Sequence, residues 1–154
     1  MATYKTNLIG QAANTPDGAN DVVQVLSVFS LTAALAAADT VQLCYLPARC
    51  VPSSLIIAPD DLDSGTTATY KVGLLDPTSG GPTTDDDVFL STQSGMQTGT
   101  AVTAAHSATN SFLDIAPVDY DRVVYLTMVA GPTTASTGKV RALFSYRAYD
   151  ARSA

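Results

Sequence analysis

The stretch IIAPDDLDSGTTATYKVGLLD, Ile56 to Asp76, holds an acidic turn that is followed by an alternating run of residues. In that run Ala68, Tyr70, Val72 and Leu74 are apolar, and polar or small residues stand between them. Alternation with a period of two is typical of a β-strand that buries one face. The stretch therefore predicts a strand that begins directly after a turn.

The same alternation recurs elsewhere in the chain, at Val41, Leu43 and Tyr45 and again from Val140 to Ala148. Three further runs are apolar on both faces: Val22 to Leu31, Val51 to Ala58 and Val123 to Val129. Strands of this kind are covered on both sides. Because the chain has too few helices to cover them all, we expect part of this surface to be buried between subunits of an oligomer.

The composition also favours strands and turns over helices. All fourteen acidic residues are Asp, and the 154-residue chain has twenty Thr, eight Pro and no Glu. Asp favours turns and helix starts, whereas Glu favours helix interiors. Turn signals separate the apolar runs at the spacing of a sandwich. We predict an all-β fold, a jelly-roll-like antiparallel β-sandwich of about eight strands with one short helix.

The length fits a single domain. Residues 21–154 are expected to form one β-sandwich (jelly-roll) domain, and residues 1–20 an N-terminal arm or a first edge strand. The start of the sequence carries no secretion signal, so synthesis in the cytoplasm is expected.

The net charge of −6 argues against binding to nucleic acid, because phosphate contacts need a basic patch and the eight basic residues are scattered singly. Binding to an anionic membrane surface is disfavoured for the same reason. The apolar stretch from Val22 to Ala38 approaches the length of a membrane span. Polar residues interrupt it and its first half is β-branched, which favours a buried strand followed by an Ala-rich turn.

One helix is predicted over TTDDDVFLSTQSG. Thr84 would be the N-cap, Asp85, Asp86 and Asp87 would lie in the first turn, and Gly95 would end the helix.

The cluster Asp60, Asp61 and Asp63 could be a metal site, a catalytic carboxylate pair or a turn. An EF-hand loop that starts at Asp61 would have Gly65 at its fifth position and Val72 at its twelfth, where a Glu is needed. The turn interpretation is favoured, with solvated Asp side chains capping backbone N–H groups and Gly65 at positive φ. A looser calcium site remains an alternative, and no cofactor is expected.

The remaining chemically reactive side chains are few. Cys44 and Cys50 are expected to be buried free thiols, with a strained local disulfide as the alternative, and one His cannot complete a zinc site with them. The single His106 is expected to lie in a solvated loop, and no G-x-S-x-G motif accompanies it. We therefore expect no enzyme.

Several strings resemble a group of small virion proteins of tailed bacteriophages. They are APDDLDSGTTATYKVGLLD, TVQLCYLPARCVPSSLIIA, DDDVFLSTQSG and DRVVYLTMVAGPTTASTGKVRALFSYRAY, and the resemblance spans residues 20 to 149. It implies a jelly-roll decoration or cement protein on the capsid exterior, commonly a trimer, that binds the major capsid protein and has no catalytic residues.

The sequence therefore predicts one of two functions. The first is a structural protein that cements a phage capsid, with apolar residues of the N-terminal segment, Tyr4, Leu8 and Ile9, as candidate interface residues. The alternative is a glycan- or receptor-binding module of a phage fibre or tail, which requires a concave aromatic patch.

Overall fold

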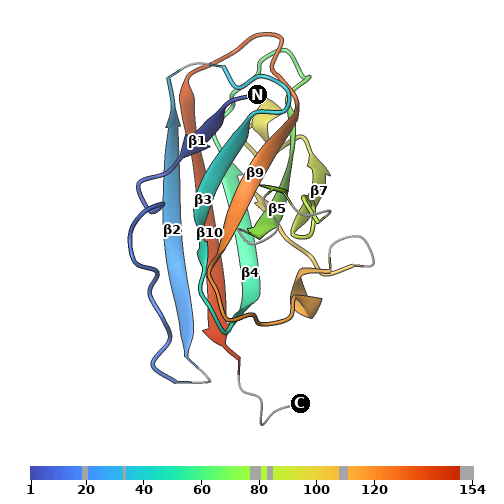
Figure 1. The fold of residues 1–154 in the computed structure, drawn as a ribbon. Helices are drawn as coiled ribbons and strands as arrows, with labels where there is room; N and C mark the ends of the chain where they lie inside the picture. The colour runs from blue at the N-terminus through green and yellow to red at the C-terminus, as the bar shows by residue number, and fades with distance from the viewer. Residues whose placement is uncertain (19–20, 33, 77–80, 83–84, 108–110, 150–154) are drawn as a thin grey trace.

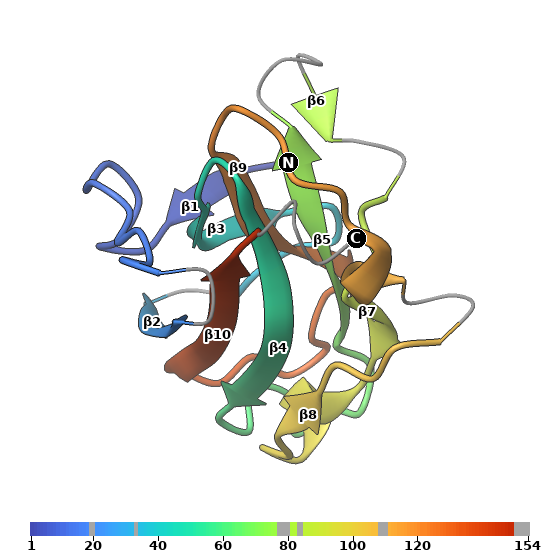
Figure 2. The ribbon, with the colours of Figure 1, turned by 90° about the horizontal axis from the view of Figure 1, so that it is seen from below.

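Two β-sheets pack face to face in a computed structural model that describes residues 1–18, 21–32, 34–76, 81–82, 85–107 and 111–149 (Figures 1 and 2). The first, called here the β9 sheet, contains β1 (Thr3–Lys5), β3 (Thr40–Leu46), β5 (Thr69–Asp76), β6 (Gly81–Pro82), β7 (Leu90–Gln93) and β9 (Arg122–Ala130). The second, the β10 sheet, contains β2 (Val22–Leu31), β4 (Cys50–Pro59), β8 (Val102–Thr103) and β10 (Gly138–Ala148). The predicted all-β sandwich is confirmed.

Strands that are distant in the sequence lie side by side. The strand order is β1-β3-β9-β5-β6, with β7 also on β5, in one sheet and β2-β10-β4-β8 in the other. The chain changes sheet at each step from β2 to β5, and every pairing is antiparallel except that of β1 with β3. This alternation is compatible with the jelly-roll-like expectation.

The core lies between the two sheets, and the predicted alternation places it there. Tyr70 and Val72 of β5 are fully buried, as are Phe144 and Tyr146 of β10. The ring of Phe144 lies 5.7 Å from that of Phe89 in an edge-on arrangement and 5.6 Å from that of Tyr146. Such ring pairs add about 0.5–1.5 kcal/mol each to the stabilisation from buried area.

The N-terminal segment runs along the side of the sandwich where β1 and β2 are the outermost strands (Figure 1). The Thr6 hydroxyl donates to the Leu43 carbonyl at 2.6 Å, and the Tyr146 hydroxyl donates to the Asn14 carbonyl at 2.6 Å. The segment is therefore bonded to both sheets of its own domain.

The predicted helix over Thr84 to Gly95 is wrong. Thr84 lies outside the described residues, Asp86 and Asp87 lie in a turn, and Leu90–Gln93 form β7. The described residues contain two short 3-10 helices instead, η2 (Gly95–Gln97) and η3 (Phe112–Asp114).

Strand pairing and burial explain why no helix forms there. The Phe89 N–H donates to the Val72 carbonyl at 3.1 Å, and the Phe89 side chain is fully buried in the core. The backbone of Asp86 passes so close to Gly73 that a Cβ on Gly73 would overlap it. These tertiary contacts outweigh the local preference of the Asp residues for a helix N-terminus.

Within its own chain, β2 is covered on one face only. It forms an edge of the β10 sheet, and its outward residues Val22 and Leu26 are 57% and 59% exposed. The predicted preference for a strand over a membrane span is confirmed in this segment. Within the described residues, no helix has the length and apolar character needed to cross a membrane.

Candidate assembly surface

The acidic turn between β4 and β5 is a structural clamp. Asp63 is fully buried, and its carboxylate accepts N–H bonds from Gly65 at 2.9 Å, Thr67 at 2.7 Å, Ala68 at 2.7 Å and Thr134 at 3.2 Å. The first three donors belong to its own turn, and the last belongs to the loop between β9 and β10. The predicted capping of backbone N–H groups is confirmed.

Two details of the turn differ from the prediction. Thr66, and not Gly65, has positive φ, at 65°. Asp63 is buried and not solvated, which is possible because several N–H donors replace its water. Burial alone would raise the pKa of Asp63, but these donors together hold the pKa far below the usual value.

Asp60 extends the clamp to β10. It accepts a bond from the Arg141 guanidinium at 2.7 Å and one from the Lys139 N–H at 2.9 Å, and these contacts lower its pKa. In the predicted cluster, the carboxylates of Asp60 and Asp63 thus both accept hydrogen bonds from protein donors. Among the described residues, no group of three or more potential metal ligands comes together, at this turn or elsewhere.

The other chemically reactive candidates also lie in structural settings. His106 is in a loop with 38% of its side chain exposed, as expected, and its Nε2 lies 3.7 Å from the Asp114 carboxylate. Cys44 and Cys50 are buried and free, as predicted. Burial raises the pKa of Cys44 to about 12 and also raises that of Cys50, so neither thiol is a ready nucleophile.

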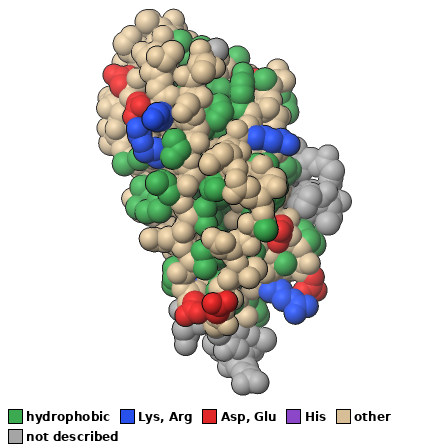
Figure 3. Space-filling model, turned by 90° about the vertical axis from the view of Figure 1, so that its left-hand side faces the viewer, with side chains coloured by type: hydrophobic (Ala, Val, Ile, Leu, Met, Phe, Trp, Pro, Cys, Tyr) green, Lys and Arg blue, Asp and Glu red, His purple; other side chains and the backbone are tan. Residues whose placement is uncertain are grey.

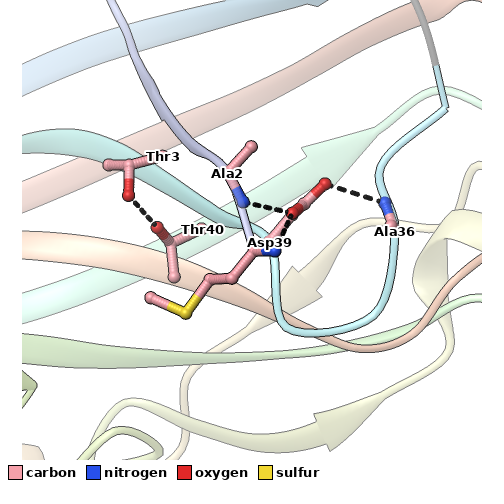
Figure 4. Close-up of polar contacts among 6 residues, drawn as sticks. Ala2, Thr3, Ala36, Asp39 and Thr40 are labelled. Atoms are coloured by element: carbon pink, nitrogen blue, oxygen red, sulfur yellow. Dashed lines mark hydrogen bonds and ion pairs between the residues drawn. The ribbon is translucent and has the colours of Figure 1, made fainter.

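Asp39 holds the first residues of the chain against the β9 sheet (Figure 4). Its carboxylate accepts the N–H bonds of Ala2 and of Ala36, which hold its pKa below the usual value. It also lies 3.9 Å from the Met1 ammonium group. Next to it, the Thr3 and Thr40 hydroxyls are 3.2 Å apart.

The predicted interface residues lie on this anchored segment. Tyr4 packs on Phe29 of β2 with ring centroids 5.7 Å apart, and Leu8 packs against the core, so each is half-buried within its own chain. Ile9 is half-buried as well. The segment thus closes one side of the sandwich and leaves only part of these three side chains accessible.

The outer face of the β10 sheet carries a row of apolar side chains across three strands. Leu143 of β10 pairs with Leu26 of β2 on one side and with Ile56 of β4 on the other. Directly paired residues point to the same side of a sheet. Leu143 and Ile56 are half-buried, and Leu26 is mostly exposed. The row is extended by Val28 and Ala58, which both pair with Arg141.

Basic side chains lie on the same outward row of β10. Lys139 and Arg147 are exposed, and Arg141 pairs with Asp60 at the margin of the face. The strand residues of this sheet are all described, and none of them is acidic. Seen from the side of β2 and the N-terminal segment, hydrophobic side chains extend down the molecule and the charged ones lie in small separate groups (Figure 3).

The outer face of the β9 sheet is covered differently. The segment around Asp86 lies on Gly73, with an ion pair between Asp86 and Lys71, and the outward-pointing Tyr125 is only 3% exposed. Acidic residues therefore outnumber basic ones on this face, where the tract Asp85–Asp87 accompanies Lys71, whereas basic residues outnumber Asp60 on the face of the β10 sheet.

Comparison with solved structures finds this fold in phage capsids. The chain is similar to a chain of the capsid of Ralstonia phage GP4, with a TM-score of 0.84 and 26% identity over 97% of this chain and 100% of that one. It is also similar to a chain of the capsid asymmetric unit of cyanophage Pam1, with a TM-score of 0.66 and 20% identity over 94% and 98% of the two chains. A third match is to the acid-stable capsid of Helicobacter pylori bacteriophage KHP30, with a TM-score of 0.55 and 14% identity over 82% and 91%.

No family model and no curated protein matches the chain. The structural matches nevertheless define a class. The predicted resemblance to bacteriophage capsid proteins is confirmed, and the chain is a phage capsid-related protein.

The sequence predicted the class of protein but not the exposed face of the β10 sheet. The run from Val22 to Leu31 indicated part of that face, because it is apolar at both odd and even positions. The alternating row of β10 drew attention to its core residues, so Leu143 and the basic residues beside it were not singled out. Their grouping with Ile56 depends on the pairing of strands that are far apart in the sequence.

Proposed function

We propose that this chain is a structural protein of a phage virion that decorates the capsid exterior and cements it through protein–protein contacts. The observation that supports this most strongly is the match to the GP4 capsid chain, which covers the whole of that chain. The matched capsid chain thus has about the same length as this one, which is the size expected of a small accessory subunit. The proposed partner is the major capsid protein.

The surface of the molecule is consistent with this role. A large, mostly apolar face with few charges binds by area and shape, and an interface of standard size buries about 1,600 Å² in total. Repetition over a lattice multiplies modest contacts into a strong restraint on the shell. In addition, the accessible parts of Tyr4, Leu8 and Ile9 are proposed to contact a sister subunit, with a trimer as the expected oligomer. No catalytic step is proposed.

The glycan-binding alternative receives less support. Tyr149, 42% exposed, is the one aromatic side chain in the described part of the chain that is largely accessible. Stacking of sugars needs a cluster of accessible rings, and Tyr4 and Tyr120 are half-buried.

The direct test is to add the purified protein to shells of the parent particle that lack it. Sedimentation of the protein with the shells, together with a higher melting temperature of the shells, is expected. If the protein stays in the supernatant and the shells melt at the same temperature, the proposal fails. Light scattering on the free protein tests the trimer separately.

A further inference from the structure

The outer face of the β10 sheet is a feature that the fold itself leaves without a role. Val22 and Leu26 are the most exposed large apolar side chains in the sheets, at 57% and 59%. An edge strand of ten residues with an apolar outer face is a liability for a free protein. Such a face is retained when a partner covers it.

The charges on the face restrict the partner. The chain has a net charge of −6, yet the outward row of β10 carries Lys139, Arg141 and Arg147 and no acid. Arg141 forms an ion pair with Asp60, and the same carboxylate accepts the Lys139 N–H. Basic groups still outnumber acidic ones on this face, and burial of that excess positive charge is most favourable where the partner supplies carboxylates.

A second copy of the same face does not meet this requirement. In a two-fold symmetric contact the same patch is used by both subunits. Because β10 lies inside the sheet, between β2 and β4, such a contact would bring the basic row of one copy against that of the other. Like charges in a desolvated interface oppose association.

We propose that the outer face of β2, β10 and β4 is the surface that docks on the capsid shell, at an apolar site on the shell protein that is bordered by Asp or Glu side chains. This rests on the proposed function and specifies which face is used. Leu26, Leu143 and Ile56 form the apolar centre, and Lys139 and Arg147 pair with carboxylates of the shell.

The test compares matched variants in binding to shells that lack the protein. Leu26→Asp places a charge in the centre of the face and is expected to weaken binding by about tenfold or more, because an unpaired carboxylate is buried. Val129→Asp is the control, since Val129 is 44% exposed on a strand of the other sheet. It is expected to bind like the wild-type protein. Melting of the free variants checks that both are folded.

The charge requirement is tested by a second pair. Arg147→Glu is expected to weaken binding and to reduce its dependence on salt, whereas Lys5→Glu, on the exposed end of β1, is expected to change neither. If both Leu26→Asp and Arg147→Glu bind the shells as tightly as the wild-type protein does, the inference is overturned. The proposed function would still stand in that case.

Two other outcomes are distinct from that one. If the wild-type protein does not sediment with shells, the proposed function fails and the inference fails with it. If Leu26→Asp reduces the mass of the free protein from an oligomer to a monomer, the face joins copies of this chain, and the inference is overturned.

Discussion

At the scale of single residues, Asp63 is the side chain on which the acidic turn most depends. Its carboxylate takes four backbone N–H bonds while the residue is fully buried. Among these donors the Ala68 N–H is buried, and a buried donor that loses its acceptor is left without water to replace it. The Asp63 carboxylate thus has a structural role, which is to hold its own turn and the loop between β9 and β10 together.

Substitution of this residue should therefore be costly. In Asp63→Asn, the amide NH₂ replaces an acceptor oxygen and faces N–H donors, so a clear fall in the melting temperature is expected. Asp61→Asn, at the exposed neighbouring position, should leave the melting temperature unchanged. Thermal denaturation of both variants checks this, and equal melting temperatures would show that Asp63 does not have the clamping role.

The carboxylates also predict how stability changes with pH. Asp39, Asp60 and Asp63 all have a pKa below the ordinary value of 3.8. As the pH falls through 3.8, the unfolded chain takes up protons at these residues while the folded protein does not. The free energy of unfolding should thus be steady above about pH 5 and fall progressively below it.

Denaturation between pH 7 and pH 3 measures this trend. Asp60→Asn removes one of the three groups, so its stability should fall less steeply with decreasing pH than that of the wild-type protein. A wild-type melting temperature that is constant down to pH 3 would contradict the assignment.

At the scale of elements, the segment that covers the β9 sheet shows where sequence reasoning succeeded and where it did not. The strands over Ala68–Leu74 and Val140–Ala148 were predictable because their alternation is imposed by the core they face. The segment Asp85–Leu90 has local features of a helix start, but Phe89 is drawn into the core and Leu90 begins a strand on β5. The packing of this segment on the sheet depends on Gly73, which lies too far away in the sequence for a local pattern to include it.

Gly73→Ala tests this element directly. The added Cβ would overlap the backbone of Asp86, so the segment must shift off the sheet at a cost of about 1–3 kcal/mol. Gly18→Ala is the control, because the atoms its Cβ would meet belong to the Asp21 side chain, at 3.3 Å. Urea unfolding gives both values, and an unchanged free energy in Gly73→Ala would mean that the segment does not rest on the sheet.

At the scale of the whole molecule, the candidate surface arises from pairing that no single stretch displays. The apolar character of β2 was visible in the sequence, and it led to the expectation of burial between subunits. Leu26, Leu143 and Ile56 are neighbours only because the strand order is β2-β10-β4. The same strand order places the basic residues of β10 beside them. Tyr4 and Leu8, which were expected at an interface, use part of their surface to close the sandwich and leave the rest accessible.

The fold, the distribution of charge and the capsid matches together support a subunit that functions through protein–protein contacts. Its cysteines are buried, and two of its most exposed large apolar side chains, Val22 and Leu26, lie on the outer face of the β10 sheet. Electron cryomicroscopy of shells incubated with the purified protein measures the central claim directly. We predict density for the sandwich at repeated positions on the shell exterior, with β2, β10 and β4 against the shell. Bare shells, or subunits that dock through the β9 sheet, would contradict it.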